Sequence, residues 1–380
     1  MEEVVILSAT RTPIGTLNGA LSSYTAPQLA AKAIQGALER ARVEKEKIDE
    51  VVMGNVVSAG IGQAPARQAM IYAGLPASAG ATTVNKVCGS GMKAVMMAAQ
   101  SIRLGDSRLA VAGGMESMSK APFILEKARS GYRLGHSQLV DSIIKDGLWD
   151  PYGNIHMGDC GEMCAEKYQI TRQSQDEYAI STYQSAQRAQ KEGAFADEIV
   201  SVDGIDTDEE PTRASFDKIP KLKAAFKAGG TITAANSSKI DDGAASLVLG
   251  STQAVNGRPA LARIKGWATF SQEPNWFTTA PAGAIQRLLE RVGWKKEEVD
   301  LFELNEAFSL VPLACMQLLG IPREKVNVNG GAVALGHPIG ASGARILVTL
   351  VHALKRRGLA RGVAAICLGG GEAVAVAVER

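Results

Sequence analysis

One pattern of residues occurs twice in this chain, in residues 89–116 (GSGMKAVMMAAQSIRLGDSRLAVAGGME) and again in residues 341–372 (ASGARILVTLVHALKRRGLARGVAAICLGGGE). Each copy begins with small residues, continues as a helical run, expected over 93–104 and 346–357, and ends in an apolar strand, a glycine-rich turn and a glutamate. Such units are common in α/β proteins, so the likeness is open to that general explanation. We interpret it as an internal duplication, which predicts two similar halves.

Strands and helices alternate outward from both copies. Apolar runs at residues 4–7, 51–53 and 301–304 predict strands, and the apolar spacing over residues 26–42 predicts a helix. Uninterrupted apolar runs are typical of strands that are covered on both faces. The expected fold is therefore α/β, with helices on each side of a mixed or parallel sheet. A more polar stretch, from about residue 117 to residue 238, interrupts the alternation, and we expect it to be an insertion.

Composition and charge exclude several classes of function. Lys and Arg number 41 and Asp and Glu number 39 among 380 residues, whereas a protein that binds nucleic acid through phosphates needs clustered positive charge. No run is apolar enough to predict a membrane span, and the acidic start at residues 1–3 does not resemble a targeting segment. The five cysteines lack the paired spacing of a zinc site. We therefore expect a cytoplasmic protein that requires no metal and binds neither nucleic acid nor membrane.

Glycine is unusually abundant, at 40 of 380 residues, which is about 10% against an ordinary level of about 7%. Twelve of these glycines lie in the cysteine and histidine loops described next and in the turns that follow the two repeated strands. A glycine leaves room for a ligand to approach the backbone. The pattern therefore predicts that backbone amides contact a substrate.

Cys88 lies in the segment VNKVCGSG (residues 84–91), between an extended run and a helix expected from about Gly91. At a helix N-terminus the dipole and the free amides favour a thiolate, so we expect the pKa of this cysteine to be lowered. The small residues that follow would let a carbonyl oxygen approach backbone N–H groups, as in an oxyanion hole. A lone cysteine is more often a small buried residue, so other residues must support a catalytic role.

Three further residues suit the same chemistry. His337, in a glycine-rich loop (residues 330–343), could deprotonate a thiol near neutral pH or could cap a turn. Cys367 ends an apolar strand just before three glycines, which suits a general acid or base. Asn305 follows a strand and could hold a water molecule or cap a helix. Together with Cys88 these residues predict an acyl-transfer site.

The chain resembles the thiolases, and among them the short-chain type that acts on acetoacetyl-CoA. The likeness runs from Val4 to the last strand. It rests on separated motifs in the family's order, namely residues 8–15 (SATRTPIG), 85–91, 305–308 (NEAF), 330–343 and 367–371.

The resemblance implies a thiolase-like fold, with duplicated βαβαβαββ halves in five-layered α-β-α-β-α packing and an inserted loop domain. It divides the chain into an N-terminal domain (residues 1–117 and 239–259), a loop domain for CoA binding and oligomer contacts (118–238) and a C-terminal domain (260–380). Members of the family form dimers through their N-terminal halves, and these dimers often assemble through the loop domain, so a homotetramer is expected.

The resemblance also implies a reversible condensation of two acetyl-CoA molecules to acetoacetyl-CoA and free CoA, through an acetyl-cysteine intermediate. Cys88 would be the nucleophile, His337 would activate its thiol, and Cys367 would remove a proton from the second acetyl-CoA. Asn305 would hold the water that shares one oxyanion hole with the histidine. The backbone N–H groups of Cys88 and Gly369 would form the other.

Six residues would contact the acyl group and the pantetheine arm, by the same resemblance: Leu148, His156, Met157, Ser238, Ala307 and Phe308. The histidine and methionine favour a small acyl pocket, although a loop histidine can equally make a structural hydrogen bond. Four lysines nearby could meet the CoA phosphates, but we interpret them as a solvated surface: Lys218, Lys221, Lys223 and Lys227.

The sequence departs from the family beside the expected site. The common Asn-Ala-Ser-Gly reads Asn-Ser-Ser-Lys at residues 236–239, and the glycine turn continues as Glu372-Ala373 where a glycine is usual. No cofactor is expected to be required. Four residues nevertheless resemble the monovalent-cation site of mitochondrial-type members, which makes potassium a candidate ligand: Tyr183, Ala234, Ala235 and Val333.

Two alternative functions remain open at this point. A degradative 3-ketoacyl-CoA thiolase with a longer acyl range would use the same site chemistry. A non-catalytic, lipid-binding relative would share the fold, but the joint presence of Cys88, His337 and Cys367 argues against it. The sequence does not decide the acyl-chain preference or the direction in which a cell runs the reaction.

Overall fold

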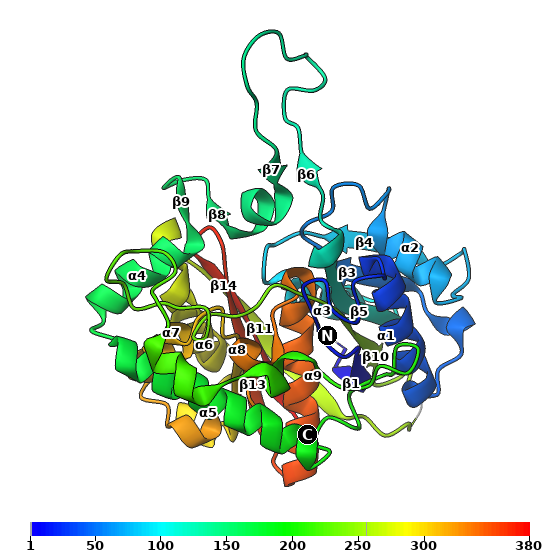
Figure 1. Cartoon of the computed structure of the whole chain (residues 1–380). Coiled ribbons are helices and arrows are strands. Elements are labelled where there is room, and N and C mark those ends of the chain that lie inside the picture. Colours follow the sequence, from blue (N-terminus) through cyan, green and yellow to red (C-terminus); the bar gives the residue numbers. More distant parts are fainter. Residues whose placement is uncertain (1, 256) are drawn as a thin grey trace.

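The computed structural model describes residues 2–255 and 257–380. Met1 and Asn256, which belong to the predicted N-terminal domain, lie outside the described residues. A mixed sheet runs through the molecule in the strand order β12-β13-β14-β11-β1-β10-β5-β3-β4, and the short β2 (Gly15–Thr16) pairs with β10 (Figure 1).

Each half of the chain supplies one side of this sheet. The first half contains β1 (Val4–Arg11), α1 (Ala26–Ala41), β3 (Glu50–Gly54), α2 (Pro65–Tyr72), β4 (Gly80–Val84), α3 (Ser90–Leu104), β5 (Leu109–Ser117) and β10 (Asp241–Ser251). The second contains β11 (Ala262–Ser271), α6 (Ala280–Val292), β12 (Leu301–Leu304), α7 (Leu310–Leu319), α8 (Ala332–Leu335), α9 (Ile339–Arg357), β13 (Arg361–Leu368) and β14 (Glu372–Glu379).

The pairing of the strands confirms the predicted duplication. In the first half, β3 is parallel to β4 and β5, and β10 is antiparallel to β5 and β1. In the second half, β12 is parallel to β13, and β14 is antiparallel to β13 and β11. The counterpart of β4 is reduced to one parallel bridge between Phe302 and Val326. The halves join where Val5 and Ile6 of β1 pair with β11.

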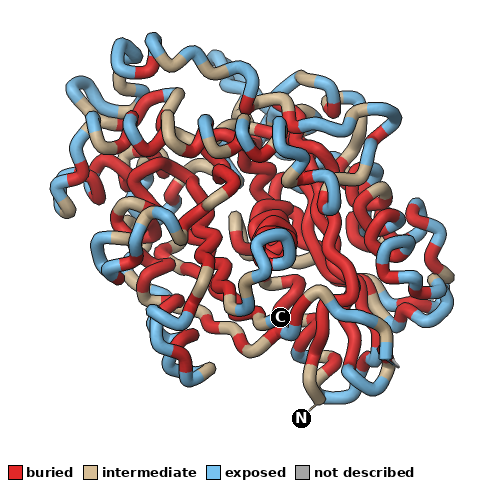
Figure 2. The backbone as a smooth tube through the Cα atoms, turned by 90° about the horizontal axis from the view of Figure 1, so that it is seen from below, coloured by how far each residue is buried: buried red, intermediate tan, exposed pale blue. Residues whose placement is uncertain are grey.

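The layers are helix, sheet, helix, sheet, helix, as the family resemblance implies. Helices α1 and α2 share one apolar cluster with the outer face of the first half, and α6 and α7 share another with the outer face of the second. Helices α3 and α9 lie between the halves, and their side chains form the central cluster with strands of both. The tube coloured by burial shows buried backbone through this middle layer (Figure 2).

Helices α3 and α9 cross with their backbones in contact. A Cβ added to Gly343 would lie 2.6 Å from the Met92 backbone nitrogen, and one added to Gly91 would lie 2.9 Å from that of Ala344. Any larger side chain at these positions would push the helices apart. The duplicated glycines therefore bring the N-termini of the two central helices side by side.

Two predicted boundaries are wrong, for one physical reason. Strand β5 does not turn at Gly113 and Gly114 but continues to Ser117, and α9 begins at Ile339 instead of residue 346. A Cβ on Gly114 would lie 2.1 Å from the Gly340 carbonyl oxygen. The glycines thus serve close packing of the α9 N-terminus on β5, and not chain reversal.

The region between β5 and β10 is irregular, as its polar sequence predicts. It contains two short hairpins, β6 (Phe123–Ile124) with β7 (Val140–Asp141) and β8 (Trp149–Asp150) with β9 (Ile155–His156), and the helices α4 (Met157–Lys167) and α5 (Arg172–Lys191). The chain between β6 and β7 projects from the body of the molecule (Figure 1). Within the described ranges, no helix is long and apolar enough to cross a membrane.

Candidate active site

A cavity of about 310 Å³ lies beside the N-termini of α3 and α9. Nine of the eleven residues predicted for catalysis or substrate binding line it: Cys88, Leu148, His156, Met157, Ser238, Ala307, Phe308, His337 and Gly369. The other two, Cys367 and Asn305, lie behind this lining and are almost completely buried, with 0% and 1% of their surface exposed. The structure thus brings together motifs from both halves and from the inserted region.

Cys88 stands on a tight turn between β4 and α3. Val87 before it has a φ of 46°, in the left-handed region that a β-branched residue rarely adopts. Side chains brace the turn: Asn85 Oδ1 accepts from the Val87 N–H (3.0 Å), and Ser90 Oγ accepts from the Lys86 N–H (2.8 Å) and donates to the Val87 carbonyl (2.6 Å). The turn therefore fixes the direction in which the thiol points.

The structure favours the protonated form of Cys88, whereas the sequence predicted a thiolate. Burial raises its pKa to about 12, although its own N–H and that of Gly369 lower the pKa in part. The prediction of a lowered pKa is wrong because desolvation of the thiol outweighs the effect of the helix N-terminus. The two N–H groups nevertheless converge on the sulfur, as donors for an oxyanion formed there would have to do.

His337 is held in one tautomer by its neighbours. Its backbone N–H donates to Asp241 Oδ2 (2.8 Å), and its Nδ1 lies 2.5 Å from Ser342 Oγ. The Ser342 hydroxyl also donates to the Pro338 carbonyl (2.9 Å), which can only accept. The serine oxygen must therefore accept a hydrogen bond from a protonated Nδ1. This leaves Nε2 without a proton and free to act as a base.

Burial and, to a smaller extent, the charge of Arg345 together lower the pKa of His337 to about 3. The imidazole is therefore neutral at physiological pH, as a proton acceptor must be. Its Nε2 lies 3.5 Å from Asn305 Nδ2. Asn305 extends the β12 ladder through its N–H to the Ala365 carbonyl, whereas α7 begins only at Leu310, so the predicted alternative of a helix cap is wrong.

Cys367 lies at the end of β13, in the apolar cluster that also contains Met157, Ala307 and Phe308. Burial raises the pKa of its thiol well above the ordinary value, and the adjacent Cys88 raises it further. A thiolate formed at this position would therefore be an unusually strong base. Its place directly behind the cavity suits proton transfer to a substrate held there.

Glu116 supports the site and was not predicted to do so. Its carboxylate is buried at the end of β5 and accepts from Asn55 Nδ2 (2.7 Å) and from the N–H groups of Val56, Val57 and Gly340. Burial raises its pKa to about 7 despite these donors. Glu116 ends the first copy of the repeat, and it ties the loop after β3 to the start of α9.

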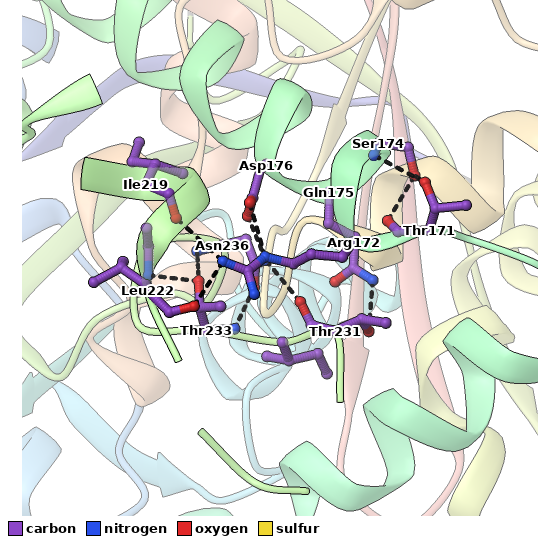
Figure 3. A network of polar contacts seen from close by, with 12 residues as sticks. Thr171, Arg172, Ser174, Gln175, Asp176, Ile219, Leu222, Thr231, Thr233 and Asn236 are labelled. Atoms are coloured by element: carbon purple, nitrogen blue, oxygen red, sulfur yellow. Dashed lines mark hydrogen bonds and ion pairs between the residues drawn. The ribbon is translucent and has the colours of Figure 1, made fainter. Parts of the chain in front are cut away.

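The cavity wall at residues 237–240 is placed by a polar network on α5 (Figure 3). Asn236 donates to Asp176 Oδ1 (2.9 Å), and Asp176 is paired with Arg172 at 2.7 Å. Beyond this anchor, the Ser238 N–H donates to the Ala307 carbonyl (3.0 Å). The wall that carries the predicted pantetheine contact is thus fixed to the loop that follows Asn305.

The inserted region supplies the opposite wall. His156 caps α4 through Nδ1, which accepts from the Gly158 N–H (3.0 Å), and its ring stacks on Phe226 with centroids 4.7 Å apart. His156 therefore makes a structural hydrogen bond and also lines the cavity. Phe226 and Phe277 also line the cavity, although neither lies in one of the motifs that predicted the site. The four lysines interpreted as a solvated surface are all exposed.

The ammonium of Lys239 lies among the residues of the predicted cation site. The Val333 carbonyl accepts from the ammonium of Lys239 (3.3 Å), and this ammonium lies 5.7 Å from the centroid of the Tyr183 ring. A second cation on the same carbonyl would be repelled, by about 4 kcal/mol for unit charges about 4 Å apart at an effective dielectric of about 20. Across the residues that the structure describes, no group of three or more His, Cys, Asp or Glu side chains is placed to hold a metal ion.

Comparisons with known proteins agree over the whole chain. Residues 4–253 match the family described as "Thiolase, N-terminal domain", and residues 258–380 match "Thiolase, C-terminal domain". Acetyl-CoA acetyltransferase 2 of Arabidopsis thaliana is 52% identical over 99% of this chain and 97% of its own length, and the acetyl-CoA acetyltransferase of Cupriavidus necator is 49% identical over the full length of both. The crystal structure of the Acat5 thiolase from Ascaris suum in complex with coenzyme A has a TM-score of 0.97, with 46% identity and full coverage of both chains.

The lowered pKa of His337 predicts a pH-dependent loss of stability. The unfolded chain takes up this proton below about pH 6.5 and the folded chain only near pH 3, so the stability is present above pH 6.5 and is lost as the pH falls. Between pH 8 and pH 5, His337 should cost about 2 kcal/mol of unfolding free energy. Urea titrations at both pH values measure this loss. Between pH 8 and pH 5, the unfolding free energy of His337→Gln should fall by about 2 kcal/mol less than that of the wild-type protein. The exposed His136→Gln should lose as much unfolding free energy as the wild type. Equal losses in all three proteins would contradict the lowered pKa of His337.

Proposed function

This chain belongs to the thiolase family, and from that premise we propose that it is an acetyl-CoA C-acetyltransferase, an acyltransferase that reversibly condenses two acetyl-CoA molecules to acetoacetyl-CoA and CoA. The observation that carries the proposal is the convergence of Cys88, His337 and the Gly369 N–H on one cavity, with Cys367 directly behind it. Relatives of about half-identical sequence and full-length coverage bear the same name.

The first half of the reaction acetylates Cys88. His337 Nε2 takes the thiol proton while the sulfur attacks the thioester carbonyl of the first acetyl-CoA. The N–H groups of Cys88 and Gly369 stabilise the negative oxygen of the tetrahedral intermediate, and each such donor is worth on the order of 10²–10³ in rate. The C–S bond to CoA then breaks, and the leaving sulfur takes the proton of Cys367. This leaves an acetyl-cysteine, a protonated His337 and a Cys367 thiolate.

The second half forms the carbon–carbon bond. The Cys367 thiolate removes a proton from the methyl group of the second acetyl-CoA, while the protonated His337 and the water proposed on Asn305 stabilise the enolate oxygen. The enolate carbon attacks the acetyl group on Cys88. As that intermediate collapses, the sulfur of Cys88 leaves and takes back the proton from His337. Protons and bonds balance, and the enzyme returns to its resting state.

The raised pKa values of both thiols suit this order of reaction steps. A thiolate with a raised pKa is a stronger nucleophile or base than an ordinary one, so neither is formed until a partner accepts its proton. The neutral imidazole of His337 is the partner for Cys88, and because the pKa of His337 lies far below that of the thiol, this proton moves as the sulfur attacks and not before. The leaving CoA sulfur is the partner for Cys367. Splitting the reaction at a covalent intermediate predicts ping-pong kinetics.

The two cysteines should separate the half-reactions. Cys88→Ala should lose more than about 10³ of the thiolysis rate and should take up no label from radioactive acetyl-CoA, since the nucleophile is gone. Cys367→Ala should still acetylate Cys88, although more slowly because water must protonate the leaving CoA sulfur, and should turn over about 10²–10⁴ times more slowly, since the acid and base of both half-reactions is lost. The buried Cys315→Ala serves as the control and should keep both activities. Peptide mapping that finds the label away from Cys88 would disprove the mechanism.

A longer acyl range is the remaining alternative within the family. Acetyl-CoA acetyltransferases of Arabidopsis thaliana and Mus musculus are about half identical to this chain, which favours a short acyl group, and the His156, Met157 and Phe308 side chains line the same cavity as Cys88. We predict that kcat/KM for acetoacetyl-CoA exceeds that for a 3-ketodecanoyl thioester by at least about tenfold. Steady-state thiolysis with both substrates measures the ratio, and a preference for the longer chain would assign the protein to the degradative type.

We also propose a homotetramer. Two features support it: strand β4 ends the sheet order and pairs with β3, which leaves an open edge for a dimer, and the projecting segment between residues 122 and 141 exposes apolar side chains. These are Phe123, Leu125, Tyr132, Leu134 and Leu139. Equilibrium sedimentation should give the mass of four chains, and of two for a Leu134→Asp, Leu139→Asp variant. The exposed Leu104→Asp should remain tetrameric, and a dimeric wild type would contradict the proposal. A cytoplasmic location stays a prediction from the sequence.

A further inference from the structure

We propose that the ammonium of Lys239 is a built-in cation that ties the pantetheine wall of the cavity to the catalytic histidine loop, and that this chain therefore needs no monovalent cation there. Lys239 stands where the family's sequence has glycine, and no role was predicted for it. The proposal rests on the acyltransferase activity proposed above, and it assigns this lysine as a positioning residue for that reaction.

The ammonium bridges two segments that are far apart in the sequence. Its Nζ donates to the Ser237 carbonyl (2.7 Å) on the cavity wall and to the Val333 carbonyl (3.3 Å) in α8, the short helix just before His337. The ring of Tyr183 on α5 lies beside it. The bridging contacts are to carbonyl oxygens and a ring face, which are the groups that a small bound cation would take.

Three carboxylates face this ammonium from the elements around it. They belong to Glu210, Asp241 and Glu306. Burial is the largest effect and lowers the pKa of Lys239, and these three acidic side chains oppose the lowering. Glu210 also accepts from the Tyr183 hydroxyl (3.1 Å). The tethered ammonium is thus placed among three acidic side chains that favour a positive charge.

The bridge acts on the backbone just before the catalytic base. The backbone of Val333 is held on both sides, since its N–H donates to Glu306 Oε2 (3.1 Å) and its carbonyl accepts from Lys239. Four residues later, the N–H of His337 donates to Asp241, which lies two residues beyond Lys239. The wall therefore clamps the histidine loop at its start through the lysine and at its end through the aspartate.

The lysine also limits what else can bind. Its side chain lines the cavity and occupies the space between Tyr183 and the Val333 carbonyl, two of the groups expected to hold potassium. An ammonium tethered to the chain cannot dissociate, so the clamp is independent of the salt in solution. Cutting the side chain back to glycine would leave a space of the right charge and size for a free cation.

Chemical rescue tests this inference. Lys239→Gly, Lys239→Met and the exposed Lys223→Gly are assayed for acetoacetyl-CoA thiolysis in a tetramethylammonium buffer, whose cation is too large to enter. We expect the glycine variant to lose at least about tenfold in kcat, and to recover several-fold on addition of ammonium or potassium. The methionine variant, which fills the space without charge, should lose as much and recover nothing. The unchanged protein and Lys223→Gly should respond to neither cation.

Thermal unfolding in the same buffers gives a readout that does not depend on activity. Ammonium or potassium should raise the Tm of Lys239→Gly and leave that of Lys239→Met unchanged. Full activity of Lys239→Gly without added cation, or a deficit that no cation relieves in a folded protein, would overturn the inference. If the wild-type protein has no thiolase activity, the proposed function is overturned instead. The Tm measurements would still test whether Lys239 ties the cavity wall to the histidine loop.

Discussion

The backbone contact between α3 and α9 is the constraint on which the site depends. These helices carry the ends of the two catalytic turns, so the distance between their axes sets how near Cys88 and His337 can come. Gly91 and Gly343 allow the helices to touch, and Gly114 lets the start of α9 lie on β5. Glu116 then fixes this arrangement by accepting from Gly340 at the helix start and from the loop after β3. The central helix layer thus determines how the catalytic turns are placed relative to each other.

Exclusion of water governs the chemistry of this cavity more than any single charge does. Both thiols have raised pKa values and the imidazole has a lowered one, which means that burial favours the neutral form of every reacting group. Charge appears only as substrates bring proton donors and acceptors with them. Backbone N–H groups are suited to this setting because they stabilise a transient oxyanion without carrying a charge of their own.

Much of the fold and of the candidate active site could be predicted from the sequence, and the exceptions have physical reasons. The repeat, the order of strands and helices, and the position of Cys88 and His337 on glycine-rich turns follow from local patterns that the structure keeps. The pKa of Cys88 could not be predicted, because a helix N-terminus is visible in sequence whereas the degree of burial is not. Gly114 looked like a turn because its partner, Gly340, is more than 200 residues away. Phe226 and Phe277 reach the cavity from irregular segments, and Lys239 showed itself only as a departure from the family.

The duplication has a consequence for how such a molecule can change over generations. One half delivers the nucleophile and the other delivers the base and the second thiol, and the two surfaces that must fit are the facing sides of α3 and α9. A single half would need two chains to build a comparable cavity, with identical faces meeting across a twofold axis. With both halves in one chain, each face can change independently of the other. The two repeat glutamates differ in this way: Glu116 is buried beneath the helix start, while Glu372 is partly exposed and pairs with Lys86 of the other half.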